Sequence, residues 1–284
     1  MTRRQTSADV FSLAESRPYS RDRMKKTFLI LAVIVLESCS RVPITNRRQL
    51  NLLPEKEMLS MSYQQYDQFL AENNVVDNGI GAKTVNAVGT KMAVAVATFL
   101  KEVGESSRIE GYEWEFRLVD DPMVNAWCMP GGKVVFYTGI LPVCKDETGL
   151  AVVMSHEIAH AIGRHGNERM SQSMAIEMGG MALGTALAKD SSITSNLFLQ
   201  AYGIGSTLGA LKFSRNQESE ADKMGLVFMA IAGYNPERAV EFWERMSQQG
   251  GSAAPEILST HPSDESRIAD IKAYLPEAMK YYKP

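Results

Sequence analysis

The sequence predicts an α+β fold, a single helix-rich domain with a small sheet and a hairpin at the sheet edge. Apolar and charged residues alternate over 112–118, as in a strand with one buried face. Residues 125–129 and 133–137 flank Pro130-Gly131-Gly132, a pattern typical of a hairpin. After Leu141 the remaining chain is helical in character. These three observations fix the predicted class.

The first 38 residues are expected to lie outside the domain. Residues 1–23 carry five arginines without apolar periodicity, and we interpret them as an N-terminal extension from an overlong start, with Met24 as the initiator. Residues 24–38 combine two lysines, nine consecutive apolar residues and a small residue, which is the pattern of a secretory signal peptide. The apolar stretch is shorter than the roughly 20 residues that a membrane-spanning helix needs.

The signal segment ends at Ser38-Cys39, which resembles the lipobox of bacterial lipoproteins, where the cysteine receives lipid. Glu37 departs from that pattern, so a plain cleaved signal and an uncleaved anchor stay open as alternatives. The polar residues 39–53 are interpreted as a lipidated, irregular tether. We therefore expect attachment through Cys39 to the periplasmic face of a bacterial membrane, as in an outer-membrane lipoprotein.

The peptide chain from 54 to 284 is expected to form the domain. Pro54 can begin a helix that runs to about Glu72. After a break at 73–81, apolar residues step by three or four from Val85 to Val103, and Gly104 ends this second helix.

Charge and cysteine content exclude several classes of protein. The whole chain has a formal net charge of −3; because the first 38 residues hold seven basic and four acidic residues, the remaining 246 carry −6. Such an acidic domain is repelled by phosphate backbones, so no nucleic-acid partner is expected. Three cysteines exclude a disulfide scaffold and a four-cysteine zinc module. We expect Cys128 and Cys144 to be buried free thiols, with a bridge as the alternative.

Residues 156–160 read His-Glu-Ile-Ala-His inside a helix predicted over 148–164. Positions i and i+4 of a helix lie one above the other, so His156 and His160 can bind one zinc ion (Zn²⁺). Glu157 then lies beside the open coordination position. The flanking residues are apolar, which indicates a buried helix, and buried histidines need partners.

The third zinc ligand is expected on a second helix. A metzincin would place a histidine ten residues after His156, but the next histidine, His165, comes one residue early. His165 is therefore expected to be a helix cap or a group behind the ligands. Glu218 can complete a two-histidine, one-glutamate site, and Asp222, one turn later, can accept the free ring N–H of a ligand histidine. Glu220 is expected to point elsewhere and to be solvated.

Four motifs occur together: HEIAH, ESEAD, NAWCMPGGKVVFYTG, and His261-Pro262 followed by Arg267-Ile268. Over about residues 40–284 they resemble the gluzincin family of the CAAX prenyl endopeptidase, HtpX and the mitochondrial inner-membrane quality-control protease. They are most similar to its bacterial lipoprotein members with a single soluble peptidase domain. The resemblance implies a zincin-type fold, zinc-dependent endoproteolysis with one Zn²⁺ per chain, and roles for the following residues: ligands His156, His160 and Glu218, catalytic Glu157, and Asp222 behind a ligand.

The resemblance also suggests a latency switch at His261. Pro262 keeps the residue before it extended, so His261 is expected in a loop, from which it could become a fourth ligand at the open zinc position. A helix cap and a substrate contact are the alternatives. For the oxyanion of the reaction, Arg267, Arg215, His165 and a tyrosine all stay open as donors. The strand 133–137 is a candidate site for an extended peptide to add to the sheet.

The function expected from the sequence is a zinc endopeptidase that cleaves misfolded or unassembled envelope proteins. Its partners are unfolded polypeptides and, through the lipid anchor, the membrane. The alternative is a zinc-binding holdase or assembly factor with little or latent proteolysis. Glu157 favours the enzyme, because a pure binding protein has no use for this side chain beside the metal.

Overall fold

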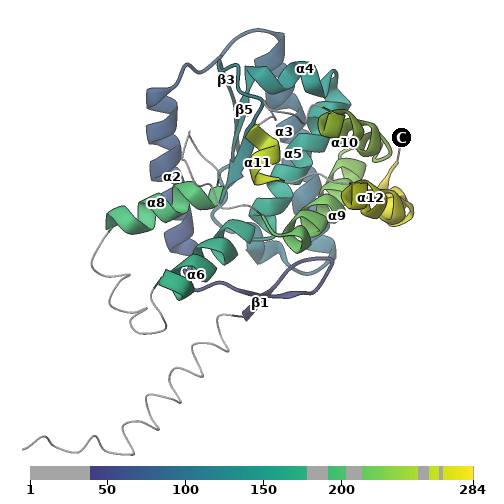
Figure 1. Ribbon diagram of the computed structural model, residues 1–284. Helices are drawn as coiled ribbons and strands as arrows, with labels where there is room; N and C mark the ends of the chain where they lie inside the picture. Colours follow the sequence, from purple (N-terminus) through teal and green to yellow (C-terminus); the bar gives the residue numbers. More distant parts are fainter. Residues whose placement is uncertain (1–38, 178–190, 203–212, 249–255, 262–264, 284) are drawn as a thin grey trace, which may run out of the picture. The chain divides into compact units, whose positions relative to one another are not determined.

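A mixed three-stranded sheet lies between helices in the computed structural model, which describes residues 39–177, 191–202, 213–248, 256–261 and 265–283 (Figure 1). Its strands are β3 (Glu115–Val119), β4 (Ala126–Met129) and β5 (Lys133–Tyr137). β5 is central, parallel to β3 and antiparallel to β4. Gly131 and Gly132 both adopt positive φ in the turn between β4 and β5, as the predicted hairpin requires.

The edge strand of the hairpin is β4, and the prediction that 133–137 is open to a docking peptide is wrong. Val135 in β5 pairs with Arg117 of β3 on one side and with Trp127 of β4 on the other. The apolar pattern of β5 indicated burial but did not reveal its neighbours. The parallel pairing with β3 joins strands that are separated by the whole hairpin, and local periodicity does not encode such a pairing.

Both faces of the sheet are covered by helices. Val134 and Phe136 point into a core shared with α3 (Ile80–Glu102), α5 (Glu147–Ile162) and α9 (Arg215–Ile231). Val135 and Tyr137 point into a second core shared with α2 (Glu55–Glu72), α6 (His165–Glu177) and α8 (Ser191–Tyr202). The side chains alternate between the two cores because successive residues of a strand face opposite sides.

The first two predicted helices are present. α2 begins directly after Pro54 and ends at Glu72, as predicted. α3 begins at Ile80, five residues before the expected start, and Gly104 with positive φ follows its end. The predicted apolar positions of α3 are buried except the last, because Val103 caps the helix and is 45% exposed.

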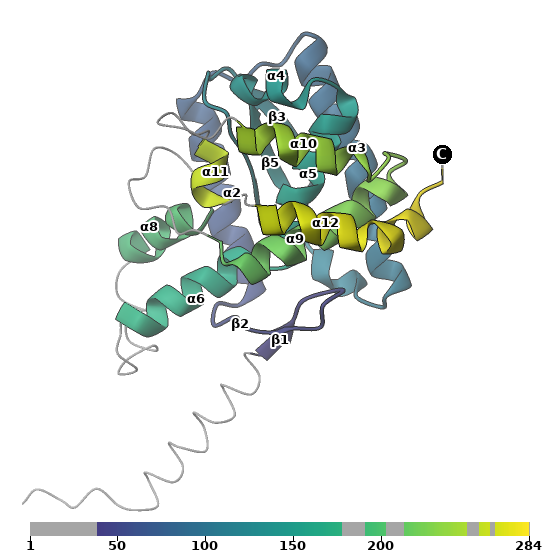
Figure 2. The same ribbon diagram turned by 45° about the vertical axis from the view of Figure 1, so that its right-hand side comes forward.

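The chain after Leu141 is helical wherever it is described, as predicted. Besides the helices already named, the structure contains η1 (Ser106–Ile109), η2 (Thr138–Ile140), α4 (Leu141–Cys144), α10 (Arg238–Gln248), α11 (Glu256–Thr260), α12 (Glu265–Ala278) and η3 (Met279–Tyr281). α5 packs along α9, and α12 packs on α9 and α10 (Figure 2). A Cβ at Gly225 of α9 would lie 3.2 Å from the backbone nitrogen of His156, so this glycine permits the close approach of α9 to α5.

The polar stretch interpreted as an irregular tether is ordered. It forms a small sheet of β1 (Cys39–Arg41) and β2 (Arg48–Leu50), with Val42 and Leu53 buried. The Gln49 side chain donates to the carbonyl oxygen of Gly163 at 2.9 Å. We call residues 40–53 the N-terminal hairpin. The described residues from Ser40 onward form one compact unit, so this hairpin belongs to the domain.

Three further expectations concern localisation and thiols. The predicted extension and signal segment, residues 1–38, lie outside the described residues. In the described part of the chain, the helices are all too short or too polar to cross a bilayer. Cys128 and Cys144 are buried free thiols, as predicted.

Candidate metal centre

α5 presents the two histidines of the HEIAH motif from successive turns. Its N-terminus is capped by Asp146, whose side chain accepts the N–H of Gly149 at 2.8 Å. The Nε2 atoms of His156 and His160 lie 3.1 Å apart, and both side chains are buried. The predicted i, i+4 alignment of the two imidazoles is therefore present.

α9 brings Glu218 to the same point from the opposite side. Ser214 and Gln217 form a capping box that starts this helix immediately before Glu218. The Glu218 carboxylate oxygens lie 3.4 Å from His160 Nε2 and 3.5 Å from His156 Nε2. Burial alone would raise the pKa of Glu218, but the neighbouring His261 and Arg267 side chains hold it well below its usual value.

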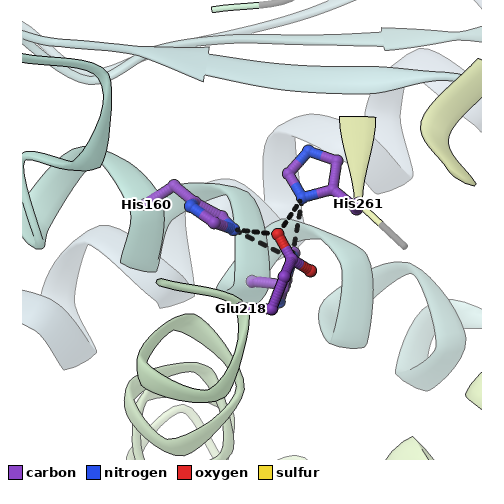
Figure 3. Close-up of side chains that lie close together, drawn as sticks. His160, Glu218 and His261 are labelled. Atoms are coloured by element: carbon purple, nitrogen blue, oxygen red, sulfur yellow. Dashed lines mark hydrogen bonds and ion pairs between the residues drawn. The ribbon is translucent and has the colours of Figure 1, made fainter. Parts of the chain in front are cut away.

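His261 completes the cluster from the C-terminal end of α11. Its backbone N–H donates to the carbonyl oxygen of Ile257 at 2.8 Å, and it directly follows the last residue of this short helix, so it lies outside the helix as predicted, although Thr260 before it is helical. Its Nδ1 atom lies 3.0 Å from Glu218 Oε1 and 3.2 Å from His156 Nε2. Figure 3 shows Glu218 between His160 and His261.

The four side chains converge on a position that suits a metal ion. Five distances between their possible ligand atoms are 3.0–3.5 Å, and one ligand atom from each of His156, His160, Glu218 and His261 lies within 4.8 Å of the others. Zinc bonds of about 2.0–2.1 Å in a tetrahedron separate neighbouring ligand atoms by about 3.3 Å. Neutral imidazole nitrogens with one carboxylate oxygen are a donor set that zinc prefers. The residues present therefore fit a zinc ion.

Glu157 lies beside this cluster. Its Oε1 atom is buried without a hydrogen-bond partner among the described residues, and His261 Nε2 lies 3.6 Å from it. Burial raises the pKa of Glu157. An unsatisfied buried carboxylate oxygen is costly to a fold, so this atom is available for a ligand or water.

Asp222 and Arg267 lie behind the first ligand. Asp222 Oδ1 is 3.0 Å from His156 Nδ1, as predicted for an acceptor of the free ring N–H. Arg267 donates to both Asp222 oxygens at 2.8 Å, and its Nη1 lies 2.9 Å from Glu218 Oε2. The oxyanion role considered for Arg267 is not favoured, because its guanidinium faces the two carboxylates and its plane covers the Trp243 ring.

His165 lies behind the ligand His160, one of the two positions expected for it, whereas Glu220 occupies a position that was not expected. Arg164 takes positive φ after the end of α5, and this turn brings His165 Nδ1 to 3.0 Å from His160 Nδ1. A continued helix would have placed His165 on the far side. Glu220 is 3% exposed, so the prediction that it is solvated is wrong. Its carboxylate contacts His165 and the N-terminal hairpin residues Thr45 and Arg47.

Three neighbours of the cluster were not singled out from the sequence. Arg47 and Thr45 lie more than 100 positions from the residues they contact. Phe213 packs against His160 with ring centroids 3.8 Å apart. It also borders a cavity of about 400 Å³ between α9 and α12, where Arg215 and Glu218 form part of the wall. The local pattern around these residues gives no signal of their position.

Comparison with known proteins assigns the family. Residues 91–275 match peptidase family M48. The chain is 34% identical over 240 residues to the mitochondrial metalloendopeptidase OMA1 of Schizosaccharomyces pombe, with 84% of this chain and 67% of that protein covered. Human metalloendopeptidase OMA1, mitochondrial, is 29% identical over 265 residues, covering 89% and 49%. The beta-barrel assembly-enhancing protease of Escherichia coli is 32% identical over 164 residues, covering 56% and 34%.

The chain thus spans between one third and two thirds of the length of these relatives. The matched segment contains the HEIAH motif, the α9 carboxylates and His261. M48 peptidases are zinc-dependent, in agreement with the donor set of the cluster. The family match confirms the resemblance seen in the motifs and the expectation of a metalloendopeptidase. The chain belongs to peptidase family M48.

Proposed function

We propose that this chain is a zinc endopeptidase that cleaves misfolded or unassembled envelope proteins on the periplasmic side of a bacterial membrane. The observation that carries the proposal is the meeting of His156, His160 and Glu218 around one point, with the unsatisfied oxygen of Glu157 beside it. Ligands that close together leave one side for a water and the scissile carbonyl.

In this proposal His156 Nε2, His160 Nε2 and a Glu218 oxygen hold the zinc ion. When bound, zinc acidifies a water towards pKa ~7 and polarises the substrate carbonyl. Glu157 accepts the proton of that water at Oε1 and delivers it to the leaving amine. The raised pKa of Glu157, caused by burial, suits both steps, since a carboxylate of ordinary pKa is a weaker base at neutral pH.

Asp222 and Arg267 position the ligand His156. Asp222 accepts the Nδ1–H of His156 and so keeps the Nε2 lone pair directed at the metal position. Arg267 fixes the Asp222 carboxylate with two hydrogen bonds. We assign Arg267 this positioning role in place of the oxyanion role.

Three observations support an unfolded substrate of the envelope. Residues 24–38 have the pattern of an export signal. The name of the Escherichia coli relative links that protein to β-barrel assembly. β4 is an edge strand that packs on α5 next to the HEIAH motif; because its four residues are at most 3% exposed, an extended polypeptide would add to it by main-chain hydrogen bonds only after the segments that cover it move aside.

A digestion assay tests this function. The purified full chain should fragment an unfolded outer-membrane β-barrel protein and casein but not the folded barrel. A zinc chelator should stop fragmentation, and added zinc should restore it. Suppressed aggregation of the unfolded barrel without fragments would instead support the zinc-binding holdase.

His261→Ala should raise basal proteolysis or provoke self-cleavage while zinc stays bound. In the structure His261 Nδ1 lies at the fourth ligand position, and Ile257 of the same short helix donates to the Val124 carbonyl next to β4. α11 therefore lies at both the metal position and the start of the edge strand, as a latency device requires. Casein cleavage rates and zinc content measure the effect, with Thr260→Ser as the matched control. Lost activity with intact zinc would show that His261 assists catalysis and that the latency idea is wrong.

Cys39→Ser should release the protein from the membrane fraction if Cys39 carries the lipid anchor. A hydroxyl cannot form the thioether bond to lipid, so the matured chain would lose its only proposed membrane attachment. Fractionation of cells expressing the wild type and Cys39→Ser checks this, with Cys128→Ser as the control thiol. Unchanged membrane association would favour an uncleaved anchor.

A further inference from the structure

We infer that Glu220 and Arg47 form a positioning relay that acts on the ligand His160 through His165, which makes the N-terminal hairpin a functional part of the metal centre. The inference rests on the zinc site proposed above. It extends that site by residues from the N-terminal hairpin, α6 and α9 that do not touch the metal position.

The relay sets the tautomers of two histidines. Glu220 Oε2 lies 3.2 Å from His165 Nε2, an ion-pair distance without hydrogen-bond geometry; because a carboxylate only accepts protons, its negative charge favours the His165 tautomer with the proton on Nε2. His165 Nδ1 is then an acceptor for the Nδ1–H of His160, 3.0 Å away. His160 Nε2 is consequently left as a free lone pair, directed at Glu218 and His156. The opposite tautomers would set two N–H groups or two lone pairs against each other.

The N-terminal hairpin fixes the carboxylate at the end of this relay. Arg47 donates from Nε to Glu220 Oε1 at 2.8 Å and from Nη2 to Oε2 at 2.9 Å, and Thr45 Oγ1 adds a bond of 2.7 Å. Arg47 also binds both oxygens of Glu168 on α6 at 2.6 and 2.7 Å. Such bidentate, charge-assisted bonds hold a carboxylate in one orientation.

Both ligand histidines of α5 are therefore backed by a carboxylate that an arginine holds in place. His156 is backed by Asp222, which Arg267 of α12 holds. His160 is backed through His165 by Glu220, which Arg47 of the N-terminal hairpin holds. Both carboxylates lie on α9, two and four residues after Glu218, so α9 orients both ligand histidines. Residues of this kind affect metal affinity although they make no bond to the metal.

The test compares zinc affinities of the full chain and two variants by chelator competition. Glu220→Gln and Arg47→Met should each weaken zinc binding about 10-fold, the lower end of the range for groups behind metal ligands. The absorption spectrum of the Co²⁺-loaded protein should shift in both variants, because the ligand field that His160 exerts on the metal ion changes. Arg47→Lys should recover part of the affinity. Arg48→Met, at an exposed arginine next to Arg47 in the N-terminal hairpin, is the matched control and should bind zinc like the wild type.

Melting curves separate positioning from simple stability. A metal ion stabilises a folded protein more, the more tightly the protein binds it. The two variants should therefore lose part of the difference in Tm between zinc-loaded and chelated protein. Equal losses of Tm with and without zinc, together with wild-type zinc affinity and an unchanged Co²⁺ spectrum, would overturn the relay. A wild-type chain that binds no zinc would refute the proposed site itself. A chain that binds zinc without cleaving peptides would refute only the proposed activity.

Discussion

Glu157→Gln should abolish peptide cleavage and leave close to one zinc ion bound per chain. Glutamine has nearly the same shape but cannot accept the proton of the attacking water. Loss of a positioned general base typically costs about 10²–10⁴-fold in rate. Zinc should stay because Glu157 lies next to the ligand set and is not one of the four converging residues. Removing the buried charge also lowers its desolvation cost, so the fold should not suffer.

The assay for Glu157→Gln measures casein fragments and zinc content on the same preparation. Glu147→Gln is the matched control, since Glu147 lies on the same helix, is partly exposed and contacts Lys91 and Tyr234 away from the cluster. The control should cleave like the wild type. If Glu157→Gln loses zinc together with activity, its assignment as the base is wrong.

Glu218→Ala should lose zinc. The expected drop in zinc affinity is well beyond the 10–100-fold typical of a change at a residue behind a metal ligand. Glu218 is the sole carboxylate among the four converging residues. Its removal leaves Arg267 Nη1, now 2.9 Å from a Glu218 oxygen, as a buried positive charge beside the metal position. This charge, although still paired with Asp222, repels a dication, and the loss of one buried ion-pair partner also destabilises the fold.

Metal analysis and melting with and without chelator measure the effect of Glu218→Ala. Ser219→Ala, the next residue on α9, controls for a change at this point of the helix. Since His261 could supply a third imidazole, Glu218→Ala combined with His261→Ala should remove any residual binding. Full zinc content with full activity in Glu218→Ala would exclude Glu218 as a ligand. Glu220 could not replace it, because its carboxylate faces His165 and Arg47.

The sequence alone determined the features that depend on local periodicity, namely the helices and the pairs of residues that share one helix face. The i, i+4 spacing of His156 and His160, and that of Glu218 and Asp222, places each pair on one face of a helix whatever surrounds it. Capping and apolar period likewise predicted α2, α3 and α5 to within a few residues. The α+β class followed from the same kind of signal. A strand alternates apolar and polar residues with a period of two, whereas a helix repeats them about every 3.6 residues, so the two kinds of segment can be told apart along the chain.

The tertiary structure decided which elements meet. The central position of β5 depends on its parallel pairing with β3, and the burial of Glu220 depends on Arg47, 173 positions away. Polar side chains at 40–53 suggested a solvated tether, but a polar residue is equally suited to a buried ion pair when its partner is brought to it by the fold. His165 faces His160 only because the chain turns at Arg164. Contacts between distant segments arise when whole helices and strands pack together. The hydrophobic period of one segment shows which of its faces is buried but does not specify which element covers that face.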